Sequence, residues 1–443
     1  MVGGGPEGIE LAVAIQVEGQ AAKRGMIPRL PAPDKLLADM RAWVEGEYGP
    51  VVRDAAVTSK GPCAELRLEL HPAVDAMTIT ADEQGGVVVS AETAGAGPGY
   101  HTFACRILDR LGEVLDIAWS RRPELLPPGS PPAWVGARLP LADRPLVERD
   151  HLASLGAAVG RAVALRRRGI TGVEIGLRPG TRFASDGTVM TPVGPRGDAW
   201  LARAARDLTV AADVLPWWYD VMDARYQLAR ALVILWTEIR WRPPADDAER
   251  ATMDEALTLL RKAFPTDPSL AYPYREWAEL IALRGLADPI AERVLRRAEQ
   301  ADQAQPPIGY RRRPVTVVHE GWLLPVPGSF SDRRADGEWS GGDRGRHVTF
   351  AATVTQLPGG MPMSADRFLT DVAGELGEGT LHHEDGGLRG RARVTSDASS
   401  GVEVAVLEGF SAVTGSGCAI RVEFNESEDW RWAIDLWRSL RPT

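Results

Sequence analysis

Apolar residues in the first part of the chain change from a strand-like to a helix-like spacing and back. Alternate positions are apolar from 9 to 17, which predicts a strand with one buried face, and residues 33–48 carry apolar side chains at helical spacing. Three further strands are indicated at 66–70, 77–80 and 87–91, and an amphipathic helix at 100–115. We therefore expect a small α+β domain over residues 1–120.

A proline-rich stretch interrupts these patterns. Residues 121–150 contain seven prolines, whose rings fix φ and remove amide donors, so we expect a linker there. The segment that follows, residues 151–197, is expected to connect two domains. It indicates a helix at 150–167 and a hairpin-like pair of strands at 173–177 and 188–191.

Helical spacing and aromatic residues dominate residues 198–307, which hold six of the fourteen tryptophans. The sequence LLRKA at 259–263 recurs as VLRRA at 294–298, an offset of 35 that is near the tetratricopeptide period of about 34. Residues 256–280 resemble the second helix of one tetratricopeptide unit and the first helix of the next. The resemblance implies a pair of repeats, and an unrelated helical bundle is the alternative.

The last segment, residues 308–443, is rich in strand patterns. Strands are indicated at 315–318, 322–325, 347–354, 388–395, 402–407 and 418–424, and helices at 365–376 and 429–440. Three sequences here, GWLLPVPGSF, SADRFLTDVAGEL and DWRWAIDLWRSL, resemble the PsbP-like α/β sandwich. This resemblance implies an antiparallel sheet with helices on its faces and a role in binding or assembly, without a catalytic motif.

The chain as a whole is therefore expected to be a multi-domain α+β protein. An N-terminal α+β domain, a central helical region of tetratricopeptide-like type and a C-terminal antiparallel α/β sandwich of PsbP-like type follow one another.

The charge and the cysteines limit the partners and the compartment. The net charge is −9, and the basic residues, nearly all arginine as in a GC-rich bacterial genome, are dispersed among acids, so no nucleic-acid partner is expected. The three distant cysteines are expected to be free thiols in a reducing cytoplasm. The first residues lack a signal-peptide pattern and no apolar run has the roughly 18–20 residues of a membrane span, so no membrane partner is expected.

Several catalytic signatures do not occur in the sequence. None of the four lysines follows a glycine as in a phosphate-binding P-loop, and the zinc-protease, paired-cysteine, kinase and serine-hydrolase motifs are missing. We therefore expect no catalytic residues, no metal ligands and no cofactor, and whether the chain is an enzyme stays open, with a non-enzyme favoured.

A glycine-rich turn before the helix at 100–115 is the best local candidate for ligand binding. Gly97 and Gly99 can direct backbone N–H groups at an anion, and His101 and Cys105 lie four residues apart on one helix face. These four residues can bind a ligand, as a thiolate–imidazole pair or half of a metal site. In the alternative, the glycines form a tight turn, His101 lines the start of the helix and Cys105 is a core residue.

Aromatic residues and arginines are the candidates for binding a partner. Tyr226, Trp236, Tyr274 and Trp277 are expected to form a groove for a partner helix or tail, or else a buried aromatic layer. The consecutive Arg311, Arg312 and Arg313 can bind an acidic partner, or else form a solvated hinge.

A second group of aromatic residues can be either anchors or core. Trp217, Trp218, Tyr219 and Trp241 are anchor residues if they are exposed and core residues if they are buried. The cluster at 382–385, His-His-Glu-Asp, is expected in a solvated hairpin turn. A simple turn hydrogen bond is expected at His71 and Asp75, and an orienting pair is the alternative.

These observations favour a non-catalytic cytoplasmic adaptor or scaffold that binds another protein. The first alternative is an enzyme or small-ligand receptor that uses residues 95–105, and the second is a structural subunit of a larger assembly.

Overall fold

The computed structural model describes most of the chain and divides it into two compact units. The described residues are 7–23, 30–121, 143–184, 187–285, 287–302, 304, 306–335, 337–343, 345–374, 376–397, 404–426 and 428–443. Residues 122–142, most of the expected proline-rich linker, lie outside them. Unit 1 comprises residues 1–178, 185–237 and 255–273, and unit 2 comprises residues 179–184, 238–254 and 274–443.

Helices and antiparallel sheets occur in both units, so the protein is a multi-domain α+β protein. Each unit consists of several chain segments, and residues of the expected helical region 198–307 occur in both. None of the described helices combines the length and the apolar character that a membrane span requires.

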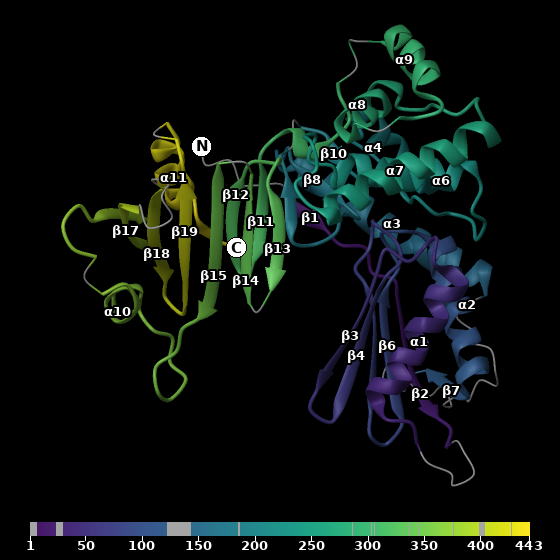
Figure 1. Ribbon diagram of the computed structural model, residues 1–443, viewed down its shortest axis with the longest axis horizontal. Coiled ribbons are helices and arrows are strands. Elements are labelled where there is room, and N and C mark those ends of the chain that lie inside the picture. The colour runs from purple at the N-terminus through teal and green to yellow at the C-terminus, as the bar shows by residue number, and fades with distance from the viewer. Residues whose placement is uncertain are drawn as a thin grey trace. The chain divides into compact units, whose positions relative to one another are not determined.

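A six-stranded antiparallel sheet with the order β3-β4-β5-β6-β2-β7 forms one core of unit 1 (Figure 1). Its strands are β2 (Ala14–Ala21), β3 (Asp54–Lys60), β4 (Cys63–Glu69), β5 (Met77–Asp82), β6 (Gly86–Glu92) and β7 (Ile117–Arg121). Alternate side chains of β4 and β5 are buried, as Leu66, Leu68 and Ile79 illustrate. This period of two is the pattern from which the strands were predicted.

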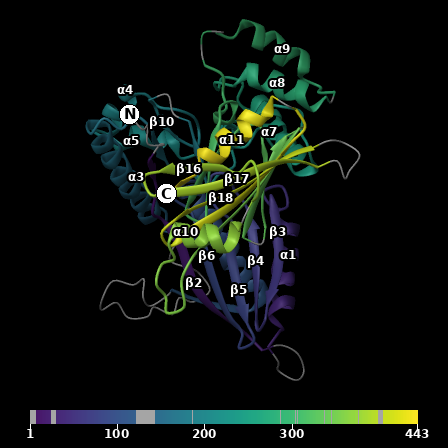
Figure 2. The ribbon, with the colours of Figure 1, turned by 90° about the vertical axis from the view of Figure 1, so that its left-hand side faces the viewer.

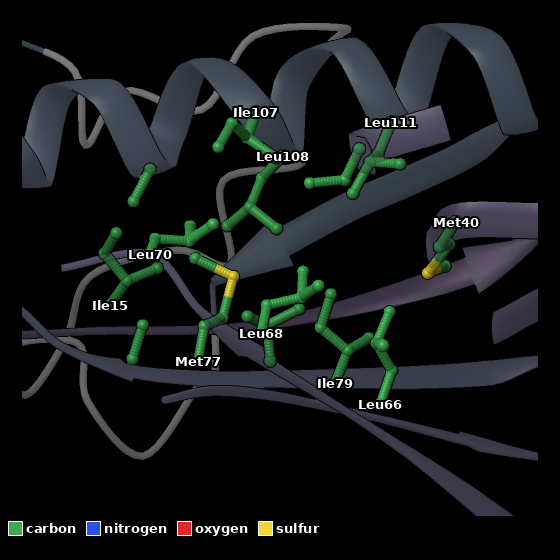
Figure 3. Close-up of a cluster of buried hydrophobic side chains, with 14 of the residues drawn as sticks. Ile15, Met40, Leu66, Leu68, Leu70, Met77, Ile79, Ile107, Leu108 and Leu111 are labelled. Carbon is green, nitrogen blue, oxygen red and sulfur yellow. The ribbon is translucent and has the colours of Figure 1, made fainter. Parts of the chain in front are cut away.

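Two helices, α1 (Pro33–Tyr48) and α2 (Pro98–Leu115), cover one face of this sheet. Each has a proline in its first turn, where the missing amide hydrogen breaks no helical hydrogen bond. The apolar residues of α2 face those of the sheet, with Leu108 above Met77 and Leu68 (Figure 3). The expected helix at 33–48 is confirmed with the same bounds.

A short parallel sheet with the order β1-β8-β10 belongs to a second core of unit 1. Its strands are β1 (Glu7–Ile9), β8 (Val173–Ile175) and β10 (Val189–Met190). The hairpin expected at 173–177 and 188–191 is wrong, because β8 and β10 pair in parallel. The strand expected at 9–17 is divided, because Ile9 belongs to this second core whereas Ile15 belongs to the core of the six-stranded sheet.

Helices surround the parallel sheet of unit 1. They are α3 (Arg144–Arg167), α4 (Asp198–Ala204) and α5 (Leu208–Ala211). Helix α6 (Ala224–Thr237) instead contributes Tyr226 and Val233 to the core of the six-stranded sheet. The buried face of α3 carries Leu155, Val159 and Ala162 and packs on β1 and β8. Helix α7 (Asp247–Thr266) contributes its first residues to unit 2 and its remaining residues to unit 1.

Unit 2 contains two antiparallel sheets. The four-stranded sheet β20-β12-β11-β9 consists of β9 (Thr181–Phe183), β11 (Val315–His319), β12 (Trp322–Val326) and β20 (Arg441–Pro442). The seven-stranded sheet β13-β14-β15-β19-β18-β17-β16 consists of β13 (Ser331–Ala335), β14 (Glu338–Asp343), β15 (Arg346–Val354), β16 (Leu381–Asp385), β17 (Leu388–Asp397), β18 (Val404–Val413) and β19 (Ser416–Phe424). The edge strands β13 and β16 were not expected, because polar residues dominate both.

Two helices, α10 (Ala365–Phe368) and α11 (Asp429–Arg438), pack on β18 and β19 (Figure 2). Trp437 of α11 lies so close to β18 that a Cβ atom on Gly409 would be 2.6 Å from its ring. Phe368 of α10 approaches Gly417 in the same way, at 2.4 Å. Gly417 pairs with Ala412, which points to the opposite face of β18 from Gly409, so the two helices cover opposite faces of the sheet.

The remaining helices of unit 2 are α8 (Tyr274–Arg284) and α9 (Ala291–Gln300), which contact each other. The helix expected at 365–376 is shorter, because a π-helical turn over Leu369–Ala373 follows α10. That turn ends at Gly374, whose φ of 56° is a left-handed conformation that glycine adopts without strain.

Candidate functional site

Three arginines and three carboxylates form a network in unit 1, called here the arginine network: Arg53, Glu69, Asp75, Arg178, Arg230 and Glu255. Arg53 donates hydrogen bonds to Glu255 at 2.8 Å and to Glu69 at 2.6 Å. Arg178 donates to the same Glu69 at 3.0 Å and to Asp75 at 3.3 Å. The network thus joins residues up to 202 positions apart in the sequence.

Arg230 of α6 is the innermost member of the arginine network, with 3% of its surface exposed. Its guanidinium donates two hydrogen bonds to Glu255, at 2.8 and 2.5 Å. It also donates to the carbonyl oxygens of Leu70 and Val51, and to the Tyr226 hydroxyl. Burial alone would raise the pKa of the Glu255 carboxyl, but Arg230 and Arg53 outweigh it and lower that pKa.

An aromatic cluster of His71, Tyr100, Phe103, Trp217 and Tyr226 lies beside Arg230. The Trp217 and Tyr226 rings are 4.3 Å apart between centroids, and the His71 ring lies 5.6 Å from Tyr100. All five residues are buried. The simple turn hydrogen bond expected at His71 is present, because the Ala73 N–H donates to the His71 ring, and His71 is also a core residue.

His71 is neutral in this environment. Burial lowers the pKa of its imidazole well below the ordinary value, and the positive charges of Arg230, Arg53 and Arg178 lower it further. Its Nδ1 accepts a hydrogen bond from the Ala73 N–H at 3.1 Å. Because Nδ1 is the acceptor, the single hydrogen of the neutral ring is on Nε2.

The glycine-rich turn before α2 is filled by the segment 215–219. A Cβ atom on Gly97 would lie 2.6 Å from the Trp217 carbonyl oxygen, and one on Gly99 would lie 1.9 Å from that of Tyr219. The Gly99 N–H donates to the Trp217 carbonyl oxygen, and the Gly97 N–H donates to that of Thr93. The two glycines are thus explained by close approach of the backbone, and these two N–H groups are used within the chain.

The close approach at Gly99 gives a testable expectation. Gly99→Ala should lower the stability of unit 1 by about 1–3 kcal/mol, because a backbone carbonyl moves away less easily than a flexible side chain. Gly46→Ala in α1, where the added methyl meets no atom within 4 Å, should instead stabilise the protein by about 0.5–1 kcal/mol. Denaturant unfolding measures the change in the free energy of unfolding for each variant. Equal changes in the two variants would contradict the close packing at Gly99.

His101 and Cys105 are both buried on α2. The Nδ1 of His101 lies 2.9 Å from the Thr93 hydroxyl, which also donates to the Val13 carbonyl oxygen. Since that hydroxyl hydrogen is already used, His101 Nδ1 is the donor in this pair. The His151 ring of α3 lies 5.7 Å from the ring of His101. Among the described residues, no three His, Cys, Asp or Glu side chains are placed to hold a metal ion.

The four aromatic residues expected in a groove are divided between the units. Tyr226 and Trp236 belong to unit 1, whereas Tyr274 and Trp277 belong to unit 2. Tyr226 and Trp277 are buried, and Trp236 and Tyr274 are half-buried.

The expected arginine cluster makes contacts inside unit 2. Arg311 is buried and lies 3.5 Å from Asp332, and burial lowers the pKa of its guanidinium to about 10. Arg312 forms a two-point contact with Glu279 and stacks 3.7 Å from the Trp241 ring. Arg313 is exposed.

The cluster at 382–385 was expected in a solvated hairpin turn and instead belongs to strand β16. The turn itself consists of Gly386 and Gly387, both with positive φ. His382 and His383 therefore point to opposite faces of the sheet, and the His383 ring contacts Trp437.

Three large apolar side chains of unit 1 are exposed on one loop, called here the apolar loop. They are Tyr219, Val221 and Met222, with 53%, 51% and 40% of their surface exposed. The Arg144 guanidinium lies 5.1 Å from the Tyr219 ring, and Arg106 forms an ion pair with Asp220 at 2.9 Å. The sequence indicates Tyr219 as an anchor residue if it is exposed. It does not indicate Val221 and Met222, because these two residues lie outside the helices and strands and follow no periodic spacing.

Comparison with known proteins adds little. No protein-family profile and no curated protein matches the chain. A crystal structure from Bacteroides thetaiotaomicron VPI-5482, at 1.50 Å resolution, matches 28% of this chain with 7% sequence identity and a TM-score of 0.23. The chain spans 45% of the length of that protein, and a similarity of this size carries no argument about function.

Proposed function

We propose that the chain is a non-catalytic cytoplasmic adaptor or scaffold whose protein partner docks on the apolar loop. The observation that carries this proposal is the exposure of Tyr219, Val221 and Met222 on one short stretch of chain. Contiguous exposed apolar side chains mark interaction sites, and tyrosine, methionine and arginine are enriched at interfaces. Arg106 and Arg144 supply the polar rim that such a surface has.

The apolar loop is held in place before any partner binds. Its anchor is Trp217, which is 1% exposed, accepts a hydrogen bond from Gly99 and donates one to the Ala96 carbonyl oxygen. Ordering a loop on binding reduces affinity, so an already ordered loop favours docking. The same packing supports the adaptor over a receptor at residues 95–105, because the segment 215–219 fills the space beside the glycines.

The two fold resemblances are part of the proposal. Helices α10 and α11 on opposite faces of an antiparallel sheet support a PsbP-like sandwich in unit 2. The contact between α8 and α9 supports a tetratricopeptide-like helix pair. Both kinds of module are used for binding and assembly, in agreement with an adaptor.

Site-specific photo-crosslinking tests the docking surface. A photoreactive residue at position 221 should yield a discrete conjugate with a stoichiometric partner in native cells. The matched position is Val114, which is 43% exposed on the same unit and about 22 Å farther along α2 than Gly99. The pair Tyr219→Ser and Met222→Ser should weaken co-purification of that partner at least tenfold, whereas Val114→Ser should not.

Equal crosslinking from positions 221 and 114, or retention of the partner by the double variant, would remove the apolar loop as the docking surface. Size-exclusion chromatography of the purified protein tests the other alternative, a structural subunit of a larger assembly, because such a subunit elutes as an assembly of many copies.

A further inference from the structure

Three buried polar atoms of the aromatic cluster have no hydrogen-bond partner within the described part of the chain. They are His71 Nε2, the Tyr100 hydroxyl and Trp217 Nε1. Their residues are 0%, 0% and 1% exposed, so bulk water does not reach them. The rings are mutual neighbours, at 5.6 Å, 6.2 Å and 6.1 Å between centroids.

All three atoms can donate a hydrogen bond at once. The His71 Nε2 carries the ring hydrogen, because Nδ1 accepts from Ala73. An indole nitrogen is only a donor, and a phenol hydroxyl donates readily. Three donors without an acceptor in a protein core are rare, because each unpaired buried group is destabilising.

The surrounding charge favours a negative acceptor. Arg230, Arg53 and Arg178 all act on His71 as positive charges, and Arg230 is itself buried beside the cluster. The carboxylates of Glu255, Glu69 and Asp75 are bound by the arginines of the network and accept no hydrogen bond from the three donors. A set of donors beside a buried guanidinium matches the requirements of an anion site.

We propose that His71, Tyr100 and Trp217 together bind a small monovalent anion, such as a halide or formate, through their three donor groups. The three rings are mutual neighbours, so a ligand that reaches all three donors consists of one or a few atoms. The site lies within unit 1, and its test does not require a docked partner. Because Trp217 anchors that loop, the anion stabilises the conformation that displays it.

Bromide is the probe for this site. Crystals of the full chain grown in sodium bromide should show an anomalous scattering peak within hydrogen-bond distance of His71 Nε2, the Tyr100 hydroxyl and Trp217 Nε1. In solution, sodium bromide should raise the melting temperature of unit 1 in a saturable manner at constant ionic strength, with methanesulfonate as the larger balancing anion.

Tyr100→Phe removes one donor and keeps the ring. It should weaken the apparent bromide affinity about tenfold, as expected for loss of one charge-assisted hydrogen bond. Trp217→Phe, which removes another donor, should have the same effect. Tyr272→Phe is the matched control, because the Tyr272 hydroxyl donates to the Asp267 carbonyl oxygen instead. A water molecule or no density at the three donors, or an unchanged bromide response in Tyr100→Phe, would overturn the proposal.

Discussion

Replacing Arg230 with methionine should lower the free energy of unfolding of unit 1 by about 3–5 kcal/mol. The guanidinium is 3% exposed, and its loss leaves the Leu70 and Val51 carbonyl oxygens and the Tyr226 hydroxyl without their donor. Glu255 would keep only its contact with Arg53. Hydrogen exchange of peptides from β4 and β5 measures this effect in unit 1 without interference from unit 2.

Arg41→Met is the control for the loss of an arginine. Arg41 and Glu45 form an ion pair on α1 in which both side chains remain more than 40% exposed, so the change should stay below about 0.5 kcal/mol. The double variant Arg230→Met with Glu255→Met should recover part of the lost stability, because no buried carboxylate is then left with a single partner. Unchanged exchange in Arg230→Met would show that the arginine network does not hold unit 1 together.

Trp437→Ala should lower the stability of unit 2 by about 3–5 kcal/mol. This tryptophan is fully buried and packs directly on Gly390 and Gly409, so truncation leaves a cavity between α11 and the sheet. The hydrogen exchange of peptides from β17 and β18 reports the change. Trp430→Ala is the control on the same helix, because Trp430 is 47% exposed, and its effect should stay within about 0.5 kcal/mol.

Elements with a regular local pattern could be predicted from the sequence. Helix α1 has the expected bounds, because its apolar side chains follow the helical period and a proline marks its start. The strands β4, β5 and β6 were also expected, since each buries alternate residues. The strand at 9–17 was only half correct, because the alternation continues through the point at which the chain passes from one sheet to another.

The candidate site depends on contacts that leave no local pattern. Arg230 and Glu255 are 25 positions apart, and Arg53 and Glu255 are 202 apart, so no spacing rule connects them. The sequence predicts a turn at Gly97 and Gly99. Glycine is needed at both positions because the segment 215–219 packs against them, and only the folded chain brings that segment there. His71 and Tyr100 are likewise joined through tertiary packing.

The way in which the chain is shared between the two units has a consequence for its synthesis. Unit 1 includes residues 255–273, although residues 238–254 between them and the rest of unit 1 belong to unit 2. On the ribosome, Arg53 and Arg230 are therefore made before their shared carboxylate, Glu255, and must wait for it. At roughly 5–20 residues per second, the 202 positions that separate Arg53 from Glu255 take on the order of 10–40 s to translate. Folding of unit 1 is thus coupled to elongation, and in a nascent chain stalled before residue 255 both guanidinium groups would lack the Glu255 carboxylate that joins them.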